Sequence, residues 1–76
     1  MAKINLDKYK SCDPIVYQTA ELMNQCDDPL VIIAEYSGVT KGAIEQWRWA
    51  TPKLSNVRAV LNYLGYDLAV VKLEDK

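Results

Sequence analysis

Residues 30–49 read LVIIAEYSGVTKGAIEQWRW and contain two short apolar patterns separated by a glycine. Gly38 stands where a residue in the left-handed region would end a first helix, and Thr40 can cap a second one. Ile44 and Trp47, spaced i and i+3, then form the inner face of that second helix. This layout predicts a helix-turn-helix, against which the other segments of the chain must pack.

Helix boundaries on either side of this motif are marked by proline and glycine. The Asp-Pro pair at 13–14 starts a helix, because Asp caps it and Pro needs no N–H at the first position. The Asp-Asp-Pro run at 27–29 ends this helix and starts the next in the same way. Residues 53–64 repeat apolar side chains with a period of about 3.6 residues, and Gly65 stops them. The expected helices cover 14–26, 29–36, 41–49 and 53–64.

The first and the last of these helices each have one apolar face with the period of an amphipathic helix. On the first helix the inward residues are expected to be Ile15, Thr19, Leu22 and Cys26, flanked by Val16 and Met23. On the last they are expected to be Leu54, Val57, Val60, Leu61 and Leu64.

Composition limits the class of protein. The 76 residues, half of them hydrophobic, make one small domain and not a disordered chain. No apolar run approaches the roughly 18 residues of a membrane span, and no signal-peptide pattern is visible, so we expect a cytoplasmic protein without membrane contact. Two cysteines, Cys12 and Cys26, without any histidine are too few for a zinc site. We therefore expect free thiols, no metal and no other cofactor.

The net charge of −1 hides an uneven distribution of charged side chains. Residues 13–39 carry five acidic side chains and no Lys or Arg, whereas residues 40–66 carry four basic side chains and one acidic. A basic region can turn towards phosphates even when the net charge is close to zero. The alternative is that these charges only keep the chain in solution.

The spacing of side chains in the central motif is typical of one family. Ala34, a small residue, is followed four positions on by Gly38, then by the apolar Val39 and, five positions later, by Ile44. The usual sequel is also present as Trp47, Pro52-Lys53-Leu54, Val57, Val60-Leu61 and Leu64-Gly65-Tyr66. Over residues 14–73 the chain resembles the Cro/repressor-like (lambda repressor-like) helix-turn-helix proteins. The resemblance implies an all-α fold, a compact bundle of four to five short helices, with double-stranded DNA as the partner.

The two ends of the chain flank the helix-turn-helix domain, expected at 14–66. Residues 1–13 are expected to form an arm: a short strand around Ile4 and Leu6, a basic arm on DNA and a free terminus all fit their pattern. Residues 67–76 form the tail, and the β-branched run at 68–71 predicts a short C-terminal β-strand. A lone strand needs a partner, either the Ile4 segment or the same strand of a second subunit. The family resemblance favours the second arrangement, a homodimer.

The outward face of the helix at 41–49 holds the candidate base-reading residues. By resemblance these are Lys41, Gly42, Glu45 and Gln46. An amide such as that of Gln46 can donate to and accept from adenine, Lys41 can donate to guanine, and Glu45 can accept from the cytosine amino group. The phosphate-binding residues are expected around the turn and the next helix start: Thr40, Lys53, Ser55, Asn56 and Arg58. For Trp49 the pattern leaves two roles open, packing against Pro52 or lying along the DNA backbone.

These features favour a sequence-specific DNA-binding transcriptional regulator of the phage Cro/repressor type. An antitoxin-type autoregulator of a toxin–antitoxin module fits the same residues. So does a helix-turn-helix-fold protein-interaction domain without DNA binding, which the net acidity and Glu45 favour. An enzyme is not expected, because the chain has no histidine, no nucleophile–base pair and no phosphate loop, and no small-molecule substrate is expected either.

Overall fold

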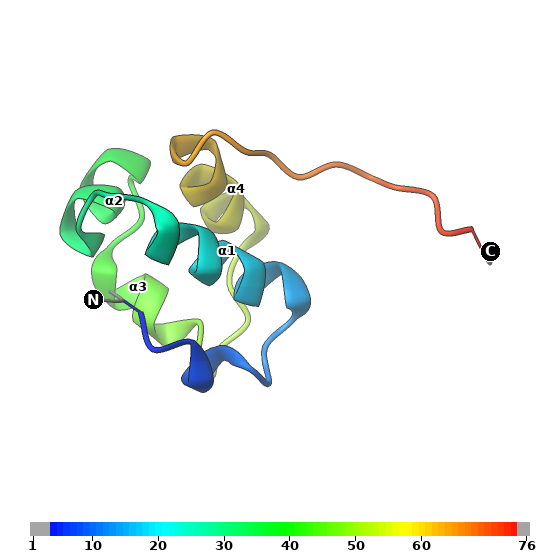
Figure 1. The fold of residues 1–76 in the computed structure, drawn as a ribbon, viewed down its shortest axis with the longest axis horizontal. Coiled ribbons are helices and arrows are strands. Elements are labelled where there is room, and N and C mark those ends of the chain that lie inside the picture. Colours follow the sequence, from blue (N-terminus) through cyan, green and yellow to red (C-terminus); the bar gives the residue numbers. More distant parts are fainter. Residues whose placement is uncertain (1–3, 75–76) are drawn as a thin grey trace.

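This computed structural model describes residues 4–74, which contain four α-helices and one 3-10 helix joined by turns and followed by an extended tail (Figure 1). In chain order they are η1 (Leu6–Tyr9), α1 (Pro14–Gln25), α2 (Leu30–Ser37), α3 (Lys41–Gln46) and α4 (Leu54–Tyr63). The predicted all-α bundle of short helices is confirmed. Within residues 4–74 no helix has the length and apolar character needed to cross a membrane.

The start of α1 is confirmed, and its buried face agrees with the predicted one only in part. The Asp13 carboxylate accepts the N–H of Ile15 at 2.9 Å, and Pro14 is the first helical residue. Ile15, however, is 40% exposed. The buried residues of α1 are Val16, Thr19, Ala20 and Met23. The inward stripe is thus turned by one residue, and Thr19 is accepted inside because its hydroxyl donates to the Ile15 carbonyl at 2.7 Å.

The second Asp-Pro pair works differently from the first. Pro29 is the N-cap of α2, and no cap hydrogen bond from a side chain is found there within the described part of the chain. The Asp28 carboxylate instead accepts a hydrogen bond from the Tyr63 hydroxyl at the end of α4. This bond raises the pKa of Tyr63 to about 12. Asp28 therefore joins two helices, and the Tyr63 ring stacks on Tyr36 of α2 with centroids 6.3 Å apart.

The turn between α2 and α3 has the predicted chemistry. Gly38 has φ 78°, in the left-handed region, and its N–H bonds to the Ala34 carbonyl at 3.0 Å. The hydroxyl of Thr40 accepts the N–H of Ala43 at 3.1 Å and so caps α3. Val39, between them, is buried.

The end of α3 comes earlier than predicted, at Gln46 and not at Trp49. The N–H of Trp47 bonds to the carbonyl of Ile44, three residues back, at 3.1 Å. That carbonyl also accepts the Tyr9 hydroxyl at 3.2 Å, which ties the end of α3 to the N-terminal segment. Tertiary contact with the N-terminal segment thus accompanies the change from α-helix to tight turns.

The last helix, α4, agrees with its predicted limits to within one residue. It is stopped by Gly65 at φ 94°, and Val57, Val60 and Leu61 are buried as expected. Leu54 is an error in the predicted face, since it is 68% exposed. It is the first residue of the helix, and the buried residues of α4 begin one turn later, at Val57.

Residues 4–12 are not a free arm and not a strand. Ile4 and Tyr9 are 6% and 3% exposed and belong to the core. The backbone N–H and carbonyl of Ile4 bond to the side-chain amide of Asn24 in α1, at 2.9 and 3.0 Å. This amide satisfies the backbone groups that a neighbouring strand would otherwise pair. Residues 1–3 of the predicted arm and 75–76 of the predicted tail lie outside the described residues.

The predicted C-terminal strand is not formed within residues 4–74. Leu68 packs partly on the core, but Val70 and Val71 are 104% and 76% exposed. The segment leaves the bundle as a single extended chain (Figure 1). Pairing with the Ile4 segment, one of the two arrangements expected, is wrong because that segment leads into η1 and is bonded to α1.

The inner face of α3 gives a direct test of the core. Ile44→Ala should lower the free energy of unfolding by about 2–5 kcal/mol, since Ile44 is fully buried in the core cluster. The matched control is Val31→Ala, which truncates a 59% exposed side chain on α2 and should change stability by less than about 0.5 kcal/mol. Urea denaturation of the two variants makes the comparison, and equal midpoints would show that the inner face of α3 is misassigned.

Candidate nucleic-acid interface

The four predicted base-reading residues lie on the solvent side of α3. Lys41, Gly42, Glu45 and Gln46 are all exposed, whereas Ile44 and Trp47 are 0% and 3% exposed. The predicted division of α3 into an inner and an outer face is therefore present in the structure. Hydrogen-bonding groups on the outer face are presented together to solvent.

Part of this face is bordered by the N-terminal segment, for which a basic arm on DNA was one of the alternatives that the sequence left open. Lys41, Glu45 and Arg48 line a hollow whose other wall includes Asn5 and Lys8. Figure 1 shows the N-terminal segment running beside α3. Lys8 was missed because its position next to α3 depends on contacts between residues about 35 positions apart, such as that of Tyr9 with Ile44.

The predicted phosphate-binding residues near the turn and the start of α4 are only partly free. Thr40 uses its oxygen as the acceptor of the α3 cap, which leaves its O–H proton as a donor. Lys53 and Ser55 are exposed at the start of α4, and Asn56 is half-buried. Among residues 4–74, no side chain bonds to the first N–H groups of α4. Such uncapped helical N–H groups can bind phosphate oxygens.

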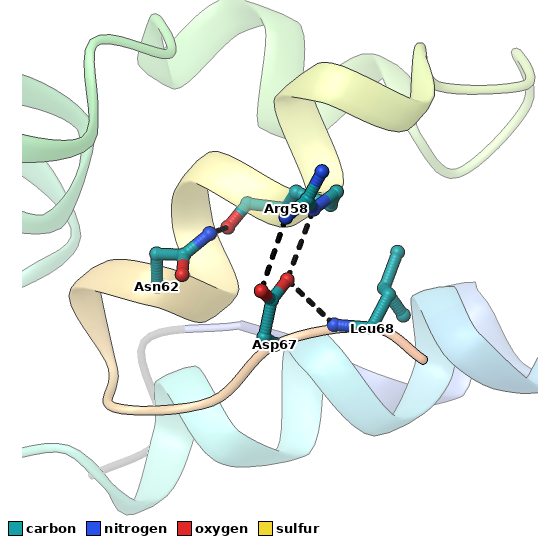
Figure 2. Close-up of polar contacts among 4 residues, drawn as sticks. All are labelled: Arg58, Asn62, Asp67 and Leu68. Carbon is teal, nitrogen blue, oxygen red and sulfur yellow. Dashed lines mark hydrogen bonds and ion pairs between the residues drawn. The ribbon is translucent and has the colours of Figure 1, made fainter. Parts of the chain in front are cut away.

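Arg58, expected to bind phosphate, is paired with an acidic side chain in this structure. Figure 2 shows its guanidinium in a two-bond contact with the Asp67 carboxylate, at 2.9 and 3.0 Å. The same carboxylate accepts the N–H of Leu68 at 2.7 Å. Asn62, one turn along α4, donates to the Arg58 carbonyl at 2.6 Å. Arg58 therefore fastens the start of the C-terminal segment to α4.

For Trp49 the structure shows an exposed ring near Pro52, and a position along the DNA backbone stays a prediction. Trp49 lines a hollow together with Pro52, Trp47 and Cys12, yet it is 69% exposed. The guanidinium of Arg48 lies 4.6 Å from its ring centre, within the range of a cation–π contact. Trp49 thus extends the exposed surface beyond the end of α3.

The candidate metal ligands among residues 4–74 do not gather in one place. In the described range, no group of three or more His, Cys, Asp or Glu side chains is placed to hold a metal ion. Neither Cys12 nor Cys26 forms a disulfide, and the thiol of Cys12 donates to the Trp47 carbonyl at 3.2 Å. Cys12 thereby supports the turn after α3.

Comparison with known proteins adds no relative. No protein-family model, no curated protein and no solved structure matches this chain.

The contact between Arg58 and Asp67 should depend on pH. The hydrogen bond from Arg58, followed by that from the Leu68 N–H, lowers the pKa of Asp67. A carboxyl whose pKa is lowered by a contact stabilises that contact above its ordinary pKa and loses it as the pH falls through the lowered value. NMR titration of the Asp67 side-chain carbon should therefore give a pKa below the ordinary value of an aspartate. An Asp67 pKa equal to the ordinary value would show that the contact is absent in solution.

Proposed function

We propose that this chain is a sequence-specific DNA-binding transcriptional regulator of the Cro/repressor-like helix-turn-helix kind, which reads the major groove with α3. The observation that carries the proposal is the outer face of α3, where Lys41, Glu45 and Gln46 present donors and acceptors to solvent on a helix fixed by buried Ile44 and Trp47. An α-helix fits the major groove, and these side-chain types pair with base edges there. We propose that this regulator is a repressor and that it acts in the cytoplasm.

Two further features support this proposal. The turn between α2 and α3 contains a left-handed glycine and a threonine cap, the local chemistry expected of a helix-turn-helix. Lys53, Ser55 and the uncapped start of α4 supply donors suited to phosphate oxygens. Base reading and phosphate positioning would thus come from different elements, as is usual in protein–DNA interfaces.

The decisive experiment compares two exposed residues with different proposed roles. Duplexes selected by the wild-type protein from a random pool provide the preferred site, and a scrambled duplex provides the reference. Gln46→Ala should weaken binding to the preferred site by about 1–3 kcal/mol and have little effect on the scrambled duplex. Lys53→Ala should weaken both alike and reduce the salt slope by about 0.9 for one lost phosphate contact.

Two results would contradict the proposal. If Gln46→Ala and Lys53→Ala behave alike, α3 does not read bases. If the wild-type protein shows no salt-dependent affinity for any duplex, the protein-interaction domain becomes the better hypothesis, and an antitoxin would be tested by co-purification with a toxin.

We further propose that residues 68–71 pair with the same residues of a second subunit and form the predicted strand in a homodimer. The support is the exposed, β-branched Val70 and Val71 on an extended segment whose start is held by Arg58 and Asp67. Exposed segments of this kind readily pair with another chain.

Dimerisation by this segment can be tested with one proline. Val70→Pro removes a backbone N–H from the ladder and should convert the dimer to a monomer in sedimentation equilibrium, because proline interrupts strand pairing. Val70→Thr, which keeps the N–H and the β-branched shape, should remain dimeric. A wild-type monomer at high protein concentration would contradict this proposal without affecting the assignment of α3.

A further inference from the structure

The hollow between η1 and α3 is lined by more cations than anions. Its charged lining residues are Lys8 of η1, Lys41 and Glu45 of α3, and Arg48 of the following turn. Arg48 is held in place because its Nε donates to the Glu45 carbonyl at 2.9 Å. Three positive side chains and one carboxylate leave this hollow electropositive in a chain whose net charge is −1.

Lys8 differs from the other described lysine of the same segment. Lys10 forms an ion pair with Asp7 at 3.2 Å, so the charges of these two exposed side chains offset each other. No ion pair of Lys8 is found among residues 4–74, and its side chain is exposed. Lys10 also borders a different hollow, formed with Tyr17, Gln18 and Glu21 of α1.

The position of Lys8 relative to α3 is set by contacts on both sides. The side-chain amide of Asn24 holds Ile4 to α1 through two hydrogen bonds, at 2.9 and 3.0 Å. The buried Tyr9 hydroxyl bonds to the Ile44 carbonyl in α3 at 3.2 Å. These hydrogen bonds fix the segment that carries Lys8, so the backbone of the segment need not become ordered when Lys8 meets a ligand.

We propose that η1 is a second wall of the DNA-binding surface, in which Lys8, together with Arg48, holds the sugar-phosphate strand at the edge of the groove that α3 enters. This inference rests on the proposed function. The reason is one of size: a helix with its side chains is about 10–12 Å across, and the major groove is about 12 Å wide. Groups directly beside α3 therefore meet the phosphates that border the groove, and a lysine there binds them without regard to sequence.

The test measures the salt dependence of binding to a duplex of mixed sequence, since a phosphate contact needs no preferred site. Lys8→Gln should make the slope of log K against log salt shallower by about 0.9. Lys10→Gln, which changes the net charge equally and lies two residues away, should leave the slope unchanged. Lys8→Arg keeps the positive charge and should retain the wild-type slope. Circular dichroism and the denaturation midpoint check that all three variants fold.

Failure of this inference can be separated from failure of the proposed function. If Lys8→Gln keeps the wild-type slope while Gln46→Ala still loses its preference for the selected site, η1 does not contact DNA but α3 does. An equal effect of Lys8→Gln and Lys10→Gln would likewise overturn the inference, because only overall charge would then matter. Absence of salt-dependent binding by the wild-type protein would overturn both.

Discussion

Ile44 and Trp47 are 0% and 3% exposed, and their burial sets the rotation of α3 about its axis. With these two side chains inside, Glu45 and Gln46 point outward, and Lys41, the first residue of the helix, is exposed as well. The cap by Thr40 and the left-handed Gly38 fix where α3 begins and how it leaves α2. The candidate reading surface is therefore a consequence of core packing, since none of its side chains is needed to hold the helix.

Polar contacts attach the N-terminal segment to the helices of the apolar core. The N-terminal segment is joined to α1 by the amide of Asn24 and to α3 by the hydroxyl of Tyr9. The thiol of Cys12 adds a contact with the Trp47 carbonyl. In a domain of this size the apolar core is small, so ties of this kind contribute a substantial share of its order. The same contacts bring Lys8 close to α3. The shape of the candidate interface therefore depends on the contacts that hold the N-terminal segment.

Arg58 illustrates how a folded chain can use a side chain differently from what its residue type suggests. Its guanidinium would suit a phosphate, but the Asp67 carboxylate occupies it with nearly ideal two-bond geometry. Both side chains are exposed, so the contact contributes little to global stability. Its effect is local: it orients the start of the C-terminal segment, and Leu68 packs on the core directly after it.

Local chemistry by itself determined the helix starts at Asp13 and Thr40, the left-handed Gly38, and the inner face of α3, because caps and helical period act within a few residues. The base-reading candidates were therefore placed on the correct side of α3 from sequence. Only the tertiary structure decided which of two adjacent stripes on α1 is buried, where α3 ends, that Arg58 is occupied, and that Lys8 borders α3. Each of these depends on contacts between residues far apart in the chain. A local sequence pattern does not show which distant residue makes such a contact.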